Sequence, residues 1–300
     1  MVGSIFEFYG YRATDSSDSA LLAAKTAECP FLEETCEKRL SDGLVSGVCS
    51  IKPITTAPVI CCPIRLYADS YQILQLIAKD AWGAENELMV GKEARNYAIK
   101  ARKPTVAVFG KRWGKELHLP KKDGFGNYFV DWILALLNSS GELVEFVAVE
   151  VQTVDTTGNY RVGRLGLEAG KRELIKTSVG INWENVSKRI IPQLVYKGQV
   201  LQREKLAKKG LYFVCPRPIF DRIMQRLGGR TMLPEYPPQH GSLTFLAYDY
   251  GDSAHWEPGK PIPLAVVDKL GTTVERLQRA FNDVTLQEPD VYQIAIEQAL

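Results

Sequence analysis

Two acidic residues stand at the ends of neighbouring predicted strands and could act on one metal ion. Asp131 follows the apolar positions 128–130, and Glu150 lies near the end of the apolar run 146–152. Between them, the segment 138–141 (NSSG) predicts a turn that joins two strands. We therefore expect the two carboxylates to lie on neighbouring strand ends.

Gln152 belongs with these acids, because alternate residues of a strand share one face. Glu150 and Gln152 are expected to point the same way, while Val149 and Val151 point into the core. Carboxylate and amide oxygens are the ligands that Mg²⁺ prefers. Such a site could activate water and stabilise charge on a phosphoryl group. The alternative is a pair of solvated acids at ordinary strand ends.

A second set of metal-ligand residues lies in the first quarter of the chain. Cys29, Cys36, Cys49 and Cys62 follow the spacing C-x6-C-x12-C-x12-C, and the adjacent Cys61 could substitute for the last one. Residues 1–10 show no secretory signal, so we expect a cytoplasmic protein in which disulfides are disfavoured. A tetrahedral zinc or iron site and free buried thiols are both compatible with this pattern. The sixth cysteine, in the apolar segment 212–216, is predicted to be a small buried residue.

The elements that must position these residues follow from apolar periodicity. Helices are expected within 70–100, over 161–175, over 186–208 with an interruption at Pro192, and in the tail at 273–281 and 291–300. Strands are expected at 105–109, from 129 onward, at 143–153, around 214 and at 243–248, the last within a proline-rich irregular region, 234–263. Residues 1–65 are predicted to be turn-rich and dependent on a bound ion. The order of elements favours an α/β (α+β) fold with a mixed central sheet flanked by helices.

The sequence resembles the NotI-type restriction endonucleases from near its N-terminus to about residue 220. The resemblance rests on several short segments whose residue types and order agree. They are 6–12 (FEFYGYR), 29–32 (CPFL), 47–49 (GVC), 62–65 (CPIR), 114–117 (GKEL), 131–132 (DW), 150–155 (EVQTVD), 185–186 (NV) and 188–189 (KR).

This resemblance implies a PD-(D/E)xK nuclease core with an iron-binding segment built on four cysteines. The metal ligands would be Cys29, Cys36, Cys49 and Cys62, with iron favoured over zinc. The metal-binding segment would occupy residues 1–68, and the endonuclease domain residues 69–300. The enzyme would act in the bacterial cytoplasm.

The resemblance also assigns the catalytic residues. Asp131 and Glu150 match the two metal-binding carboxylates, and Glu116 matches a further acid that helps to hold the metal. Gln152 falls where most of the superfamily has a catalytic lysine, and it would orient the attacking water by hydrogen bonding.

Composition excludes several classes of protein and leaves nucleic acid as a partner. The 300-residue chain has a net charge of +2, but nine Lys and Arg residues accompany a single acid over 95–122, and seven accompany one acid over 186–210. Basic stretches on both sides of a carboxylate pair suit a phosphate backbone, although solvated surface charge is an alternative. No apolar run could cross a membrane, and no nucleotide-binding glycine loop or serine-hydrolase elbow is present.

These features predict a Mg²⁺-dependent type II restriction endonuclease that cuts double-stranded DNA at a GC-rich palindrome as a homodimer. No nucleotide cofactor or membrane is expected. The alternatives are a non-catalytic, metal-stabilised DNA-binding protein and a structure-specific DNA repair nuclease. Candidate DNA contacts are Asn159, Tyr160, Arg161, Arg164, Lys188 and Arg189.

Overall fold

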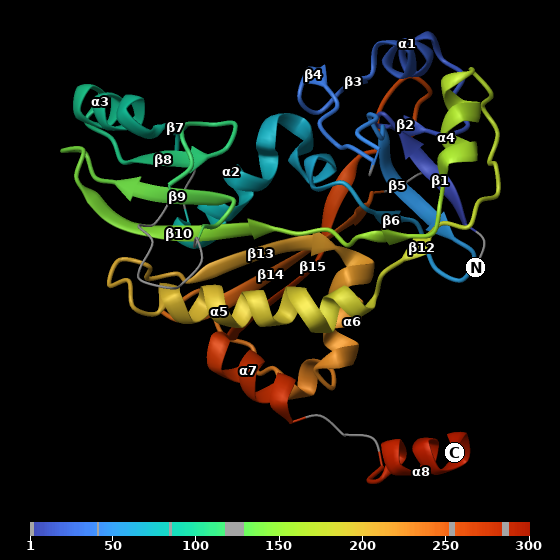
Figure 1. Ribbon diagram of the computed structural model, residues 1–300. Coiled ribbons are helices and arrows are strands. Elements are labelled where there is room, and N and C mark those ends of the chain that lie inside the picture. The colour runs from blue at the N-terminus through green and yellow to red at the C-terminus, as the bar shows by residue number, and fades with distance from the viewer. Residues whose placement is uncertain (1–2, 41, 84–85, 118–128, 252–255, 284–287) are drawn as a thin grey trace.

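The computed structural model describes residues 3–40, 42–83, 86–117, 129–251, 256–283 and 288–300. Its centre is a seven-stranded sheet in the order β15-β14-β13-β10-β9-β8-β7 (Figure 1). The pairs β7–β8, β10–β13 and β13–β14 are parallel and the others antiparallel, which confirms the expected mixed sheet. The strands are β7 (Leu88–Val90), β8 (Thr105–Gly110), β9 (Trp132–Leu137), β10 (Leu143–Val151), β13 (Leu211–Pro216), β14 (Ser242–Tyr250) and β15 (Leu264–Thr273).

Helices cover both faces of this sheet, as the sequence predicts. On one face, α2 packs its buried Ile73, Leu74 and Ile77 against apolar side chains of β8, β9, β10 and β13. On the other face, α5, α6 and α7 enclose a second core that includes Ala148 and Phe213 (Figure 1). The helices are α1 (Asp18–Thr26), α2 (Ala68–Trp82), α3 (Gly91–Ala101), α4 (Arg161–Glu168), α5 (Ile191–Leu201), α6 (Arg217–Arg226), α7 (Val274–Asn282) and α8 (Val291–Ala299).

The first 60 residues contain a second sheet that periodicity did not predict. Its four strands are ordered β2-β1-β5-β6, with bounds β1 (Gly3–Phe8), β2 (Tyr11–Arg12), β5 (Val48–Pro53) and β6 (Val59–Ile60). Residues 48–51 of β5 are all buried, so this strand lacks the alternation that marks a half-exposed strand. The expectation of a turn-rich segment was therefore wrong for β1 and β5. Two small sheets consist of two short strands each: β3 (Glu28–Cys29) pairs with β4 (Glu34–Thr35), and β11 (Thr156–Thr157) pairs with β12 (Gly180–Ile181).

Two predicted helices have different limits in the structure. The helix expected over 161–175 ends at Glu168, and Gly170 follows with a φ of +80°, which a helix cannot continue through. The helix expected over 186–208 is divided next to Pro192, as predicted: a π-helical turn (Val186–Ile190) precedes α5, and Pro192 lies in the first turn of α5. The second part of this helix ends at Leu201 and not at 208.

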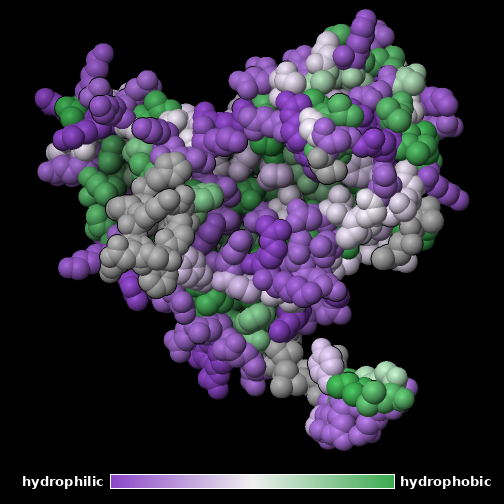
Figure 2. Space-filling view, viewed as in Figure 1, coloured by the Kyte–Doolittle hydropathy of each residue, from purple (hydrophilic) through white to green (hydrophobic). Residues whose placement is uncertain are grey.

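The C-terminal region contains one unexpected strand and two expected helices. β15 pairs antiparallel with β14 at the edge of the central sheet, and its first six residues are largely exposed. The predicted helices at the tail are confirmed as α7 and α8. No residue of α8 is buried, and Figure 2 shows an apolar and a polar side on this helix. Within the described ranges, no helix has the length and apolar content that a membrane span requires.

Candidate active site and cysteine cluster

The predicted hairpin brings Asp131 and Glu150 to the same end of the sheet. β9 and β10 are antiparallel, and Trp132 pairs with Val149. Asp131 comes directly before Trp132 and Glu150 directly after Val149, so the two acids lie side by side. The predicted turn is present, and the N–H of Gly141 donates to the carbonyl of Asn138 at 2.9 Å. The two strand ends therefore place both carboxylates together, as the sequence predicts.

Backbone contacts fix the first of these carboxylates. Oδ2 of Asp131 accepts a hydrogen bond from the backbone N–H of Val151 at 2.8 Å. Glu150 is buried on the sheet face that carries Ala148, while Val149 and Val151 lie in the core on the opposite face. The expected alternation of faces along β10 is thus confirmed.

Burial shapes the electrostatics of both acids. It raises the pKa of Glu150 from 4.5 to about 7, and the negative charge of Asp131 adds to this shift. Burial also raises the pKa of Asp131, and the charge of Glu116 adds to it, whereas the Val151 N–H opposes it. Each carboxylate is therefore stabilised by protonation or by a neighbouring cation.

A lysine from another element contacts this pair. Nζ of Lys197, on α5, lies 2.5 Å from Oε1 of Glu150, and its side chain is 14% exposed. Its charge also lowers the pKa of Asp131. Sequence reasoning missed this contact, because Lys197 was one member of a basic stretch and only the packing of α5 on the sheet brings it to Glu150.

The other two predicted catalytic residues lie at the edge of the site. Gln152 follows the last residue of β10, is half-buried, and donates from Nε2 to the carbonyl of Thr153 at 3.1 Å. Glu116 precedes a part of the chain outside the described residues and influences Asp131 electrostatically. His118, considered in the sequence for its position near Glu116, lies outside the described residues.

The carboxylate pair suits a hard cation. Oε2 of Glu150 is buried and accepts no hydrogen bond from the residues that the structure describes. A buried carboxylate oxygen without a partner is costly unless a cation approaches it. In the described ranges no three His, Cys, Asp or Glu side chains are arranged so that they could bind a metal ion as they stand. Both metal sites therefore remain predictions, which rest on the types of donor atoms that lie near one another.

The four predicted thiol ligands line one small cavity. Together with seven other residues, Lys38 among them, Cys29, Cys36, Cys49 and Cys62 line a space of about 10 Å³, roughly that of one water-sized sphere. All four are buried and none forms a disulfide. Burial raises the pKa of Cys62 to about 12 and also raises the pKa of Cys29 and Cys49. A metal ion would have to displace protons from these thiols, as four-thiolate sites do.

Cys61 has a different environment from Cys62. Its Sγ lies 3.2 Å from Nζ of Lys38, which also donates to the carbonyls of Cys61 and Val48. Burial alone would lower the pKa of Lys38, but the neighbouring Cys61 and Cys62 raise it. Cys61 therefore contacts the buried ammonium and does not line the cavity.

The remaining cysteine and two of the candidate DNA contacts have internal positions. Cys215 is fully buried in the core beneath α6, as predicted. Tyr160 is 8% exposed and shares a hydrogen bond with Ser46. Arg164 is 5% exposed and donates to the carbonyl of Val45. The expectation that Tyr160 and Arg164 contact DNA directly was wrong for this conformation, because both side chains hold the protein together.

The other candidate DNA contacts lie at the surface and several have acidic partners. Arg189 and Asn185 both contact Asp155, at 2.9 and 2.8 Å, and Lys188 contacts Glu184 at 2.5 Å. Arg161 pairs with Asp42. Such exposed pairs contribute little to stability, so a phosphate can replace the acidic partner at small cost.

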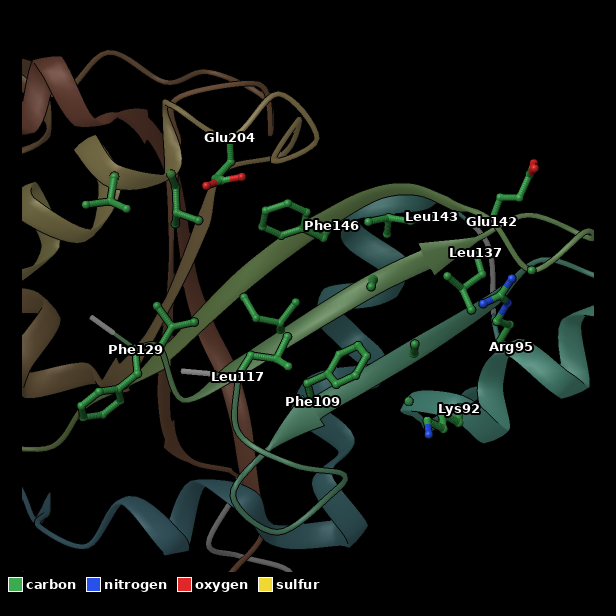
Figure 3. A pocket seen from close by; sticks show the side chains of 18 residues that line it. Lys92, Arg95, Phe109, Leu117, Phe129, Leu137, Glu142, Leu143, Phe146 and Glu204 are labelled. Carbon is green, nitrogen blue, oxygen red and sulfur yellow. The ribbon is translucent and has the colours of Figure 1, made fainter. Parts of the chain in front are cut away.

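A cavity of about 640 Å³ continues along the Glu150 face of the sheet toward α3. Figure 3 shows Phe109, Phe146 and Leu137 along its floor, with Lys92 and Arg95 of α3 at its edge. Its lining is mainly apolar and includes none of the predicted catalytic side chains.

Comparison with known proteins gives one family. The family model described as restriction endonuclease NotI matches residues 16–227 of the chain. This range contains both the carboxylate pair and the four cysteines that line the small cavity. A search of curated proteins gave no match.

Proposed function

The chain belongs to the NotI restriction endonuclease family, and we propose that it is a Mg²⁺-dependent type II enzyme that hydrolyses both strands of DNA at one sequence. The observation that supports this chemistry is the pairing of Asp131 and Glu150 at adjoining strand ends, with one buried oxygen of Glu150 left without a protein donor among the described residues. On this proposal the central sheet is a PD-(D/E)xK core.

Asp131 and Glu150 would hold the Mg²⁺, with Glu116 helping from its neighbouring position. The ion would lower the pKa of the attacking water and offset charge on the phosphate. The Val151 N–H keeps Asp131 aimed at the site. Gln152, at the end of β10, would orient the water through its amide. The water oxygen forms the new bond to phosphorus in line with the breaking P–O bond, and these residue types imply no covalent enzyme intermediate.

The cysteine cluster would hold a structural iron or zinc. Four thiolates fill a tetrahedral coordination shell, so no position remains for water or substrate. Thiolate and carboxylate donors select different metals, so this ion and the Mg²⁺ would act independently. The support is the grouping of Cys29, Cys36, Cys49 and Cys62 around one cavity that excludes Cys61.

A homodimer acting on a GC-rich palindrome completes the proposal. A two-fold symmetric dimer presents one active site to each strand of a palindromic duplex. Arginines suit guanine, because a guanidinium can donate two hydrogen bonds to its edge. Of the three candidate arginines, Arg161 and Arg189 have exposed side chains.

Digestion of a long DNA of known sequence tests this function. With Mg²⁺ and the purified protein, discrete fragments on a gel are expected, and Asp131→Asn should leave the DNA intact. A smear or progressive end-trimming would indicate a repair nuclease instead. Intact DNA with a mobility shift would indicate a non-catalytic DNA-binding protein.

A further inference from the structure

Lys197 has no assigned role in the catalytic scheme above, although it contacts the centre of the site. Its Nζ lies 2.5 Å from Oε1 of Glu150, and the two side chains are only 14% and 9% exposed. A long basic side chain is rarely so enclosed unless it is paired. The contact joins α5 to the strand that carries the catalytic acid.

The ammonium has a second contact, with an aromatic ring. The ring of Phe129, two residues before Asp131, lies 5.7 Å from Nζ of Lys197. An ammonium over an aromatic face is attracted by the ring. Lys197 thus contacts both Phe129 and Glu150, and its charge lowers the pKa of both Asp131 and Glu150.

The strand itself supplies no cation at this end. Gln152 carries an uncharged amide that donates to the Thr153 carbonyl, while Asp131, Glu150 and Glu116 are all acidic. A phosphate approaching this group would meet negative charge. A cation near the phosphate stabilises the charge that develops in the transition state.

This inference rests on the proposed function: we propose that Lys197, on α5, is the catalytic cation of this active site, which the strand itself does not supply. Without a divalent cation, Lys197 neutralises Glu150. A divalent cation and the ammonium compete for this carboxylate, and the ammonium that is displaced remains beside the phosphate of bound DNA.

This proposal predicts changes of opposite sign in two measurements. Removing the ammonium takes away a competitor, so a divalent cation should bind more tightly. It also takes a positive charge from the phosphate, so cleavage should slow. A purely structural role for Lys197 would weaken both metal binding and cleavage.

The test compares wild-type protein with Lys197→Met, which keeps an apolar stem, and with Lys197→Arg, which keeps the charge. Lys269→Met is the control, because Lys269 forms an ion pair with Asp80 that involves no residue of the active site. Thermal unfolding verifies that each variant is folded, and Lys197→Gln serves as a second neutral variant. Mn²⁺ binding to DNA-free protein is measured by calorimetry, and cleavage of a short specific duplex under single-turnover conditions.

Lys197→Met should cut at least about 100-fold more slowly, as when one charge-stabilising donor is lost. It should bind Mn²⁺ about fivefold more tightly, because the ammonium no longer competes for Glu150. Lys197→Arg should recover most of the rate, and Lys269→Met should match wild type in both measurements. Cleavage by folded Lys197→Met at the wild-type rate, or weaker Mn²⁺ binding, would overturn the inference. Wild-type protein that cuts no DNA would overturn the proposed function instead.

Discussion

Oδ2 of Asp131 accepts a hydrogen bond from the backbone N–H of Val151 at 2.8 Å, one residue beyond Glu150. This bond ties the start of β9 to the end of β10, and it sets where one predicted metal-binding carboxylate points. Asn at position 131 can keep an acceptor oxygen there while it removes the negative charge. The site's charge can therefore be changed without breaking the contact that shapes it.

Asp131→Asn should fold like wild type and lose cleavage by at least about 100-fold, because a charged metal ligand is lost. Glu150→Gln should behave alike. DNA binding should persist or become tighter in both, since carboxylates repel phosphate when no metal is bound. Single-turnover cleavage and a binding assay in Ca²⁺ check this. Full activity of either variant would remove these two residues from the site.

Gln152→Ala should cost less than either carboxylate change. Its amide orients water without charge, so a loss of about tenfold is expected, equivalent to one hydrogen bond. The same single-turnover assay, run in parallel with Glu150→Gln, gives the comparison. A loss as large as that of Glu150→Gln would show that the amide does more than orient water.

The metal-free protein should lose stability as the pH rises from about 4.5 to about 7. The folded-state pKa of Glu150 is raised to about 7 from an ordinary value of 4.5. Between these values the folded protein binds more protons than the unfolded chain, so the free energy of unfolding falls with increasing pH. Glu150→Gln should flatten this part of the curve. Chemical unfolding of both proteins across this range, in chelator, measures the difference, and identical slopes would contradict the assignment.

Replacing Cys29, Cys36, Cys49 or Cys62 with Ser should lower the free energy of unfolding by several kcal/mol, because a structural metal contributes on the order of 10 kcal/mol in such sites. Cys61→Ser and Cys215→Ser should be mild by comparison. Elemental analysis should find about one iron or zinc per chain. Metal-free protein that is fully folded and active would show that the cysteine cavity holds no ion.

A buried ion pair should also prove important for stability. Glu7 and Arg65 are fully buried, 3.0 Å apart, and Tyr250 donates to Glu7 at 2.6 Å. Arg65→Met alone should destabilise the protein by about 3–5 kcal/mol, because it leaves Glu7 as a buried charge without its partner. Replacing both residues with apolar ones should cost less than Arg65→Met alone. Denaturant unfolding of the single and double variants tests this, and additive losses would contradict it.

The sequence predicted those parts of the site that depend on local pattern. The acids of the hairpin could be found because strand alternation and a four-residue turn act over short distances. Lys197 could not, since α5 reaches Glu150 through the crossover between the parallel strands β10 and β13. The pairing of β1 with β5 is similarly non-local, and β5 has no alternating pattern to reveal it.

Sequencing the ends of every fragment is the most direct test of the central claim. Genome-sized DNA would be digested with wild-type protein and Mg²⁺, with Asp131→Asn and chelator-treated reactions as controls. The proposal predicts that all new ends share one palindromic, GC-rich sequence and that the controls produce none. Ends spread over unrelated sequences, or the same ends in the Asp131→Asn reaction, would contradict it.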